Sequence, residues 1–506
     1  MVKISEIVNQ NLWWKHGEKF VIFDKTLKEA KEKPIFFKRK RINLNKGNIY
    51  VLRGPRQIGK TTYIKDSISK LITEGIDPNH ILYLSSDFFV SRRELRNAIT
   101  YFTNKNLDIT DLYIFIDEIT SIKDWNLELK YIADSGILEK ARILATGSCS
   151  SALRRKGELL PGRGLEGNEY HMKPLSFRDF VLQTTDQVIS TIGEAELRNS
   201  LKKLLSILEK TSYNLEAELS QLFKALHQIA PFKQELDYLF NLYIRYGGYP
   251  FVVNDYLLKK LRSEQRPRQS SFSINPKLSE ALMRDIIGDI TKLGKQETFI
   301  RQILREITEK YGSRYSFSKL ATDIETTHVT AIDYLETLEE SLIVTVLYAF
   351  DFNKKDIKFK GDKKIFFQDP FMFHSVKSFL TGKDVNEIID ETLQNEELVS
   401  KLVEGIVSSH LIANQEIPIM REPKTFLWFY YDTRGKEIDN ILRINEKYTA
   451  IETKYQSEVS SRDIWRTPHV NEYAILTKED LKTEDNTVLT PVDMALAILE
   501  KSHQTL

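Results

Sequence analysis

A segment of small and basic residues follows directly after the short apolar run of residues 49–52. It reads Gly54, Pro55, Arg56, Gln57, Ile58, Gly59, Lys60, Thr61 and Thr62. This order matches the pattern G-x-x-x-x-G-K-[ST], in which glycines let backbone N–H groups surround a triphosphate. Lys60 can neutralise the β and γ phosphate oxygens, and the Thr61 hydroxyl can hold Mg²⁺. The segment predicts a site for a nucleoside triphosphate and Mg²⁺, whereas a glycine-rich turn that only opens a helix is the alternative.

Two adjacent acids, Asp117 and Glu118, follow a run of five apolar residues at 112–116. Such a run is typical of a strand buried on both faces of a parallel sheet, and ligands bind where these strands end. Asp117 is expected to bind Mg²⁺, and Glu118 to polarise the water that attacks the γ-phosphate. An acid pair that only stabilises the start of a helix is the alternative.

Small hydroxyl residues end the next expected strand, at residues 142–145. Thr146 and Ser148 are placed to hydrogen-bond the γ-phosphate or the attacking water, and capping of the next helix is the alternative for Ser148. Arg163 lies further along the chain, between two glycines. An arginine presented in this way can reach the γ-phosphate bound by a neighbouring subunit.

A second group of charged residues lies in a predicted β-hairpin. An acid-bearing strand is followed by a turn of two to four residues at 445–448 and then by an E-x-K strand. Pairing Ile444 with Thr449 places Asp439 opposite Lys454 and leaves Glu452 on the same face. Two carboxylates can hold Mg²⁺ or Mn²⁺ while the lysine orients or deprotonates the attacking water. The hairpin predicts phosphodiester hydrolysis, and a solvent-facing Glu/Lys pair on an amphipathic strand is the alternative.

Size and charge limit the classes of protein to which the chain can belong. A chain of 506 residues is too long for one hydrophobic core and should divide into about three to five domains. Its 73 Lys and Arg against 71 Asp and Glu give a formal net charge of +2, so nucleic-acid binding must come from local basic patches. The single cysteine, Cys149, excludes an internal disulfide. Neither an apolar stretch of ~18 residues nor a signal peptide is recognisable, which predicts a cytoplasmic protein without membrane contact.

The elements that position these groups follow from periodicity and turn residues. Residues 181–295 are largely helical in pattern, and two glycines among the aromatic residues of 243–251 mark a hinge or a tight packing corner. Residues 296–364 read as helices followed by a strand and a hairpin, the order of a winged helix-turn-helix. The hairpin carries Lys354, Lys355, Lys358, Lys360, Lys363 and Lys364. These lysines predict contacts to DNA phosphates, although winged helices also bind proteins.

Five motifs occur in the same order as in a known family. They are the phosphate loop at 54–62, the strand at 115–119, the small residues at 145–148, the loop at 158–164 and the segment 172–180. In this order they resemble the archaeal and bacterial AAA-type ATPases of the AAA_14 family, many of which carry a C-terminal DUF4143 domain. The segment at 10–14 is similar to the one that precedes the core in archaeal members. The resemblance implies an AAA+ ATPase that binds and hydrolyses ATP, with Arg163 as its arginine finger.

The C-terminal hairpin resembles the core of the PD-(D/E)xK nucleases. Asp439 matches their first acid, and Glu452 with Lys454 matches the second half of the motif. Glu404, in the helix-like stretch 402–411, matches an acid that such nucleases often keep on their first helix. No proline precedes Asp439, which is a departure from the usual pattern. The resemblance implies that Asp439, Glu452 and Glu404 bind Mg²⁺ or Mn²⁺ and that Lys454 assists catalysis.

These inferences predict a multidomain α/β protein with a P-loop, AAA+-like parallel sheet, a helical lid, a winged helix and a restriction-nuclease-like α/β domain. The expected parts are an N-terminal segment at 1–30, the ATPase core at 31–180, the lid at 181–295, the winged helix at 296–364 and the nuclease-like domain at 365–506. The resemblance implies that the nucleotide is ATP, and no guanine-reading N-K-x-D pattern is visible where one would be expected.

The predicted function is Mg²⁺-dependent ATP hydrolysis coupled to DNA binding and to metal-dependent cleavage of branched or single-stranded DNA. The alternative is a nucleotide-dependent signalling switch that binds a protein partner and carries an inactive nuclease fold. A translocating motor would need a ring of subunits with Arg163 acting in trans, because the chain shows one ATPase core. A homo-oligomer is therefore expected in the presence of ATP. ATP turnover that rises with DNA would favour the first function over the switch.

Overall fold

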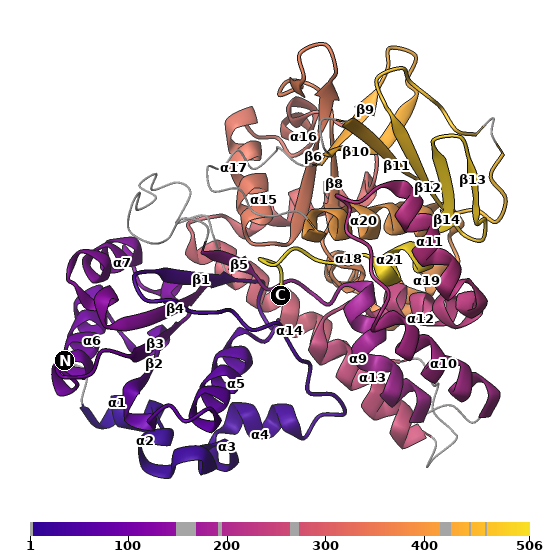
Figure 1. The fold of residues 1–506 in the computed structure, drawn as a ribbon. Helices are drawn as coiled ribbons and strands as arrows, with labels where there is room; N and C mark the ends of the chain where they lie inside the picture. Colours follow the sequence, from indigo (N-terminus) through magenta and orange to yellow (C-terminus); the bar gives the residue numbers. More distant parts are fainter. Residues whose placement is uncertain are drawn as a thin grey trace. The chain divides into compact units, whose positions relative to one another are not determined.

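The computed structural model describes residues 4–147, 168–190, 195–263, 273–414, 427–444, 447–460 and 463–506 (Figure 1). The described chain forms two compact units. The first comprises residues up to Lys173 together with Gln504–Leu506, and the second comprises most of residues 174–503.

The first unit is built on a parallel five-stranded sheet with the order β2-β3-β4-β1-β5. The strands are β1 (Ile49–Arg53), β2 (Ile81–Ser85), β3 (Leu112–Asp117), β4 (Ala141–Gly147) and β5 (Glu169–His171). The helices are α1 (Ile4–Gln10), α2 (Trp13–His16), α3 (Phe20–Phe23), α4 (Lys25–Lys31), α5 (Lys60–Thr73), α6 (Arg92–Lys105) and α7 (Trp125–Asp134). Every residue of β1 and β3 is buried, as expected for strands with helices on both faces. The predicted P-loop type of sheet is confirmed.

Side chains from the N-terminal helices close the edge of this sheet along β2. Asn11 donates from Nδ2 to the carbonyl of Tyr83 at 2.9 Å and accepts from the Tyr83 N–H at 2.7 Å. The indole N–H groups of Trp13 and Trp14 both donate to the carbonyl of Ile81, at 3.0 and 2.8 Å. These contacts satisfy backbone groups that an edge strand would otherwise offer to another chain.

The second unit contains a nine-stranded mixed sheet with the order β13-β14-β12-β11-β10-β9-β6-β7, in which β8 also pairs with β6. The strands are β6 (Val344–Asp351), β7 (Asp356–Ile357), β8 (Lys363–Phe367), β9 (Trp428–Tyr431), β10 (Glu437–Ile444), β11 (Lys447–Thr453), β12 (Glu472–Thr477), β13 (Lys482–Glu484) and β14 (Thr487–Pro491). The first helices are α9 (Phe177–Ser190), α10 (Ala195–Leu208), α11 (Leu219–Ile229), α12 (Lys233–Tyr246), α13 (Pro250–Ser263), α14 (Pro276–Lys292) and α15 (Glu297–Glu309). The later helices are α16 (Phe317–Asp323), α17 (His328–Glu340), α18 (Pro370–Thr381), α19 (Val385–Leu393), α20 (Glu396–Asn414) and α21 (Val492–Ile498).

Helices α15, α16 and α17 lead into β6 and β8, which is the order expected of a winged helix. Strand β6 pairs in parallel with β9 at Tyr348 and Trp428, so this segment shares one sheet with the C-terminal strands. The boundary expected between residues 364 and 365 falls within β8.

Two of the six lysines expected to contact DNA are buried. Lys363 and Lys364 lie on β8, and each is 2% exposed. Lys363 Nζ donates to the carbonyls of Gly361, at 2.7 Å, and of Phe359. The expectation that these two lysines bind phosphates is wrong, because their ammonium groups are bonded inside the protein and do not reach the surface.

The glycine pair at 247 and 248 forms a tight packing corner. The Gly248 N–H donates to Asp369 Oδ2 at 2.7 Å. A Cβ atom at Gly247 would lie 2.1 Å from Asp369 Oδ1, and one at Gly248 would lie 2.2 Å from the carbonyl oxygen of Leu175. Between the two alternatives for this segment, the close contacts favour the packing corner.

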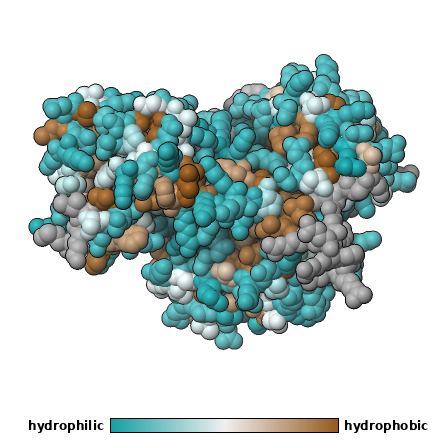
Figure 2. All heavy atoms as spheres, turned by 90° about the horizontal axis from the view of Figure 1, so that it is seen from below, coloured by the Kyte–Doolittle hydropathy of each residue, from teal (hydrophilic) through white to brown (hydrophobic). Residues whose placement is uncertain are grey.

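The face of the molecule in Figure 2 is mostly hydrophilic, and its hydrophobic patches are small and separated. Some large apolar side chains are well exposed, among them Val90 and Val329. Within the part of the chain that the structure describes, no helix is long and apolar enough to cross a membrane.

Candidate nucleotide and metal sites

The phosphate loop joins β1 to α5. Gly59 has a φ of 101°, in the left-handed region that favours glycine, and α5 begins at the next residue, Lys60. Gly54 is required for a different reason, since a Cβ atom there would lie 2.6 Å from the carbonyl oxygen of Met172. Lys60 Nζ donates to the carbonyls of Gly54, at 2.7 Å, and Pro55, at 3.1 Å. The lysine is therefore held across the loop, at a helix N-terminus whose N–H groups attract anions.

Asp117, the last residue of β3, accepts hydrogen bonds from three hydroxyl groups. Thr61 Oγ1 donates to Oδ2 at 2.7 Å, and Thr146 Oγ1 donates to Oδ1 at 2.5 Å. The third donor is the hydroxyl of Tyr83 on β2, which reaches Oδ2 at 2.9 Å. Thr61 and Asp117 thus place side by side two oxygen ligands of the kind that Mg²⁺ prefers. The sequence predicted all of these residues except Tyr83, whose one signal was a hydroxyl group within an apolar strand.

Glu118 lies beside this carboxylate with an unusual backbone conformation. Its φ is 52°, and residues held in this region often lie at functional sites. The Glu118 N–H donates to Thr146 Oγ1 at 3.0 Å, and Thr120 Oγ1 donates to Glu118 Oε1 at 3.3 Å. Arg56 Nη2 lies 3.9 Å from the same Oε1 atom. The fold therefore brings Glu118 to the end of β3, next to Asp117 and Thr146, as predicted for a residue that acts on water.

The structure describes some of the other residues predicted for this site and not others. Gln57 has a φ of 60°, Ile58 is buried and Thr62 is partly exposed on α5. Ser148 and Arg163 lie outside the described residues, so their proposed roles stay predictions.

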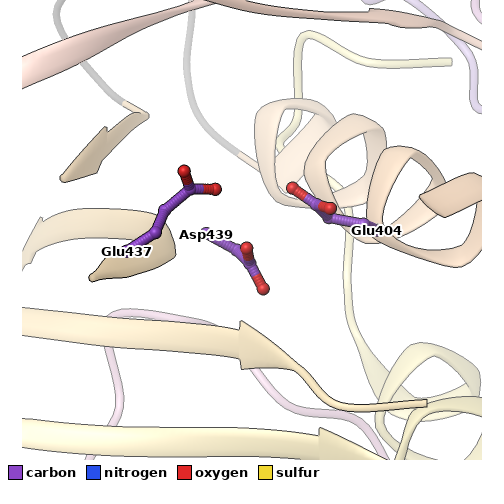
Figure 3. Close-up of side chains that lie close together, drawn as sticks. All are labelled: Glu404, Glu437 and Asp439. Carbon is purple, nitrogen blue, oxygen red and sulfur yellow. The ribbon is translucent and has the colours of Figure 1, made fainter. Parts of the chain in front are cut away.

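Three acids from two elements come together in the second unit (Figure 3). Glu404 lies on α20, while Glu437 and Asp439 lie on β10, and oxygen atoms of all three lie within 4.8 Å of one another. Glu437 and Asp439 are two residues apart and so share one face of the strand. The register with β9 shifts between Ile438 and Ile441, and such bulges re-aim side chains near functional sites.

A buried lysine lies among these acids. Lys364 Nζ contacts Glu404 Oε1 and Glu437 Oε1, and it is 3.3 Å from Asp439 Oδ1. Arg314 Nε lies 3.0 Å from the other oxygen of Glu437. Burial lowers the pKa of Lys364, but the carboxylates of Glu404, Asp439 and Glu437 raise it by more than burial lowers it. The net pKa is above its usual value, so the ammonium stays charged. The sequence predicted Glu404 and Asp439 but not Glu437, Arg314 or this role of Lys364. The one sign of that role in the sequence is a charge at the start of an apolar strand.

The observed register of the hairpin differs by two residues from the pairing of Ile444 with Thr449, and it leaves two residues between the strands, within the expected range of two to four. Ile444 pairs with Lys447, not with Thr449. The observed register, continued by one step, places Asp439 opposite Glu452. Because side chains alternate with a period of two, this shift leaves the predicted face unchanged.

Glu452 completes the acidic face of the hairpin. It is 1% exposed, and Oε2 lies 3.4 Å from Lys454 Nζ. Among the described residues, Oε1 has no hydrogen-bond partner. Burial raises the pKa of Glu452 to about 7. Asp439 is also fixed, because the Thr453 N–H donates to its Oδ2 at 2.9 Å. The oxygen donors of this face suit a hard cation such as Mg²⁺ or Mn²⁺.

The first unit has the fold and site of a P-loop ATPase, with a phosphate loop between a strand and a helix and an acid at the end of a parallel strand. A family model of an AAA domain, AAA_14, matches residues 46–181. Two domains of unknown function, DUF8612 and DUF4143, match residues 237–383 and 399–495. The chain therefore carries an AAA_14 ATPase domain followed by a DUF4143 domain, which confirms the resemblance found in the motifs.

Several known proteins are similar to this chain. The uncharacterized protein MJ1637 of Methanocaldococcus jannaschii is 25% identical over 381 residues, which are 74% of this chain and 69% of that protein. The structure of Orc1 of Aeropyrum pernix in complex with DNA has a TM-score of 0.30 and 10% identity, covering 70% of this chain and 88% of that chain. A RuvB variant of Thermotoga maritima has a TM-score of 0.26 and 13% identity, covering 68% of this chain and 89% of that chain.

Proposed function

We propose that the protein couples Mg²⁺-dependent ATP hydrolysis to DNA binding and to metal-dependent DNA cleavage. The observation that carries the proposal is the convergence of Glu404, Glu437 and Asp439 in a chain that also contains an AAA domain. Three carboxylates around one point are suited to Mg²⁺ or Mn²⁺, the ions that assist phosphodiester hydrolysis.

At the nucleotide site, each residue has a separate role. Lys60 turns from the loop carbonyls toward the β and γ phosphates, and Thr61 and Asp117 supply oxygen ligands for Mg²⁺. Glu118 polarises the attacking water, and Thr146 holds both Asp117 and the Glu118 backbone in place. Magnesium, when bound, supplies positive charge to the phosphates.

At the second site, Glu404, Glu437 and Asp439 hold the metal. Glu452 adds a further carboxylate on the same face, and Lys454 orients the attacking water. DNA is brought to this unit by the exposed lysines of the two loops between β6 and β8, which can neutralise phosphates. These lysines are Lys354, Lys355 and Lys360. We further expect the chain to form a homo-oligomer when ATP is bound, with Arg163 reaching the neighbouring subunit.

The test is cleavage of labelled single strands, duplexes, forks and four-way junctions in Mg²⁺ or Mn²⁺. Wild type is compared with Asp439→Asn, Lys60→Ala and the control Asp485→Asn, which changes an exposed acid in the turn before β14. Cleavage by wild type and the control that is lost in Asp439→Asn supports the proposal, and Lys60→Ala shows whether ATP turnover is needed. Folded wild type that cleaves none of these substrates contradicts it.

A second candidate function is a nucleotide-dependent switch that binds a protein partner. The observation that favours it is Lys364, which already neutralises the acids of the second site. The two functions differ in their response to DNA. ATP turnover that is slow and indifferent to DNA supports the switch, and turnover that rises several-fold with DNA supports the coupled nuclease.

A further inference from the structure

Lys364 occupies the position that a metal ion would take in the acid cluster. Its Nζ contacts one oxygen from each of Glu404, Glu437 and Asp439, and these are the acids whose oxygens lie within 4.8 Å of one another. Mg²⁺ binds oxygen at about 2.0–2.1 Å, so the oxygens around one ion lie within about 4.2 Å of each other. Nζ lies among the three acids, in the space that such an ion would need, so the ammonium group and a metal ion compete for it.

We propose that Lys364 is a built-in cation that closes the cluster, and that a divalent metal binds there only when the Lys364 side chain moves out. This inference rests on the proposed function, since it specifies how the same metal site is regulated.

The charges of the cluster explain why it stays closed without metal. Three carboxylates face the ammonium of Lys364 and the guanidinium of Arg314, and Lys364 is 2% exposed. Removing the ammonium alone would leave the partly buried Glu404 and Asp439 without the cation that they contact among the described residues, which is strongly unfavourable. A divalent ion can replace it because the ion brings two positive charges to the same oxygens.

Glu452 is the second observation that points to a metal. It lies across the hairpin from Asp439 on the same face, is 1% exposed, and has an Oε1 atom without a partner among the described residues. An ammonium group has three donors, and the contacts to Glu404, Glu437 and Asp439 account for all three. Mg²⁺ and Mn²⁺ take more oxygen ligands than this, so a metal could use an oxygen that Lys364 leaves unsatisfied.

The first test is Mn²⁺ binding and thermal unfolding of the full chain with Lys364→Met. In EDTA this variant is expected to unfold at a lower temperature than wild type, because the acids lose their counter-ion. Mn²⁺ is expected to bind it at least about tenfold more tightly than wild type and to raise its Tm more. Lys363→Met is the matched control, since Lys363 Nζ bonds to carbonyls of Phe359 and Gly361, and its Mn²⁺ response should equal that of wild type.

Equal or weaker Mn²⁺ binding by Lys364→Met than by wild type would overturn the proposal. A double variant that adds Asp439→Asn should lose the gain in affinity, and a gain that persists would place the metal elsewhere and overturn it too. These readouts measure binding, so a wild type that binds Mn²⁺ but cleaves no DNA would contradict the proposed function and not this inference.

A measurement on wild type covers the case in which Lys364→Met does not fold. Amine labelling followed by mass spectrometry reports whether Lys364 is buried or displaced. Saturating Mn²⁺ is expected to raise the labelling of Lys364 several-fold relative to EDTA, while the labelling of Lys363 stays constant. Labelling of Lys364 that does not change when Mn²⁺ is bound would overturn the proposal.

Discussion

Tyr83 positions the carboxylate of Asp117 without being part of the phosphate-binding motif. Its hydroxyl donates to the Oδ2 atom that also accepts from Thr61, and Lys65 Nζ lies 3.8 Å from the centre of its ring. Burial raises the pKa of Tyr83 above its usual value, so the hydroxyl keeps its proton and stays a donor. A hydrogen bond to a charged group contributes about 1.5–3 kcal/mol. We expect Tyr83→Phe to lower kcat for ATP by roughly tenfold and to raise the Mg²⁺ concentration needed for half-maximal rate.

Tyr113→Phe is the control for this prediction. Tyr113 lies on the neighbouring strand β3 and pairs with Ile81, away from the carboxyl end of the sheet. Steady-state hydrolysis measured over a range of Mg²⁺ concentrations compares the two variants. The same rate and Mg²⁺ dependence in Tyr83→Phe and Tyr113→Phe would show that Tyr83 has no positioning role.

The difference between Tyr83 and the phosphate loop shows what a sequence can predict at the level of residues. Lys60 and Thr61 belong to one short motif, so spacing alone identifies them. Tyr83 and Asp117 lie 34 residues apart, and Lys364 lies 40 residues from Glu404 and 73 from Glu437. These contacts depend on strand pairing and helix packing, which leave no local pattern in the sequence.

At the level of elements, replacing two glycines by alanine is expected to have opposite effects on stability. A Cβ at Gly248 would lie 2.2 Å from the carbonyl oxygen and 2.6 Å from the nitrogen of Leu175, whereas a Cβ at Gly288, inside α14, meets nothing within 4 Å. We expect Gly248→Ala to lower the free energy of unfolding by at least about 3 kcal/mol, because packed backbone must move. Gly288→Ala should raise it by about 0.5–1 kcal/mol through helix propensity. Chemical denaturation measures both, and a Gly248→Ala variant as stable as wild type contradicts the packing corner.

The same packing corner contains Asp369, and this carboxyl group predicts that the stability of the protein depends on pH. Burial raises the pKa of Asp369 to about 7, against about 3.9 in an unfolded chain. The folded state therefore binds this proton more tightly, and the stability it adds is present near pH 4 and lost as pH rises toward 7. We expect Asp369→Asn to reduce this pH-dependent loss of stability by up to about 4 kcal/mol, measured by urea unfolding between pH 4 and 8. Parallel pH profiles for wild type and Asp369→Asn would contradict the assignment.

The positions of the strands could be predicted from the sequence better than the register in which the strands pair. Apolar runs identified β1 and β3, and the turn between charged strands identified the hairpin of β10 and β11. The pairing of Ile444 with Thr449 is wrong because two residues, not four, separate the strands, and the sequence there allows a turn of two to four residues. The burial of Lys363 and Lys364 was missed for a related reason, since a lysine pattern does not reveal that both faces of β8 are covered.

At the level of the whole molecule, residues far apart in the sequence complete the ATPase sheet. The chain from 504 to 506 lies alongside β5, with a parallel bridge between His171 and Thr505. The His171 N–H donates to the carbonyl of Gln504 at 2.8 Å, and the Leu506 N–H donates to the carbonyl of His171 at 2.9 Å. Leu506 is fully buried. No motif analysis could predict this pairing, because it uses backbone groups of ordinary residues more than 300 positions from the strand that they cover.

This pairing predicts that residues 504–506 stabilise the nucleotide-binding unit. Ending the chain at His503 removes the two hydrogen bonds to His171 and exposes apolar surface that Leu506 now covers. We expect the unit to lose about 2–4 kcal/mol of stability and the midpoint of its thermal unfolding to fall, both without ligand and with an ATP analogue. Thr505→Ala is the control, because it keeps the backbone pairing and Leu506 and should therefore lose less stability than the truncated chain. If the truncated chain unfolds at the same temperature as wild type, the pairing of residues 504–506 with β5 does not stabilise the unit. If its unfolding temperature falls only when the nucleotide is bound, the effect lies at the phosphate loop.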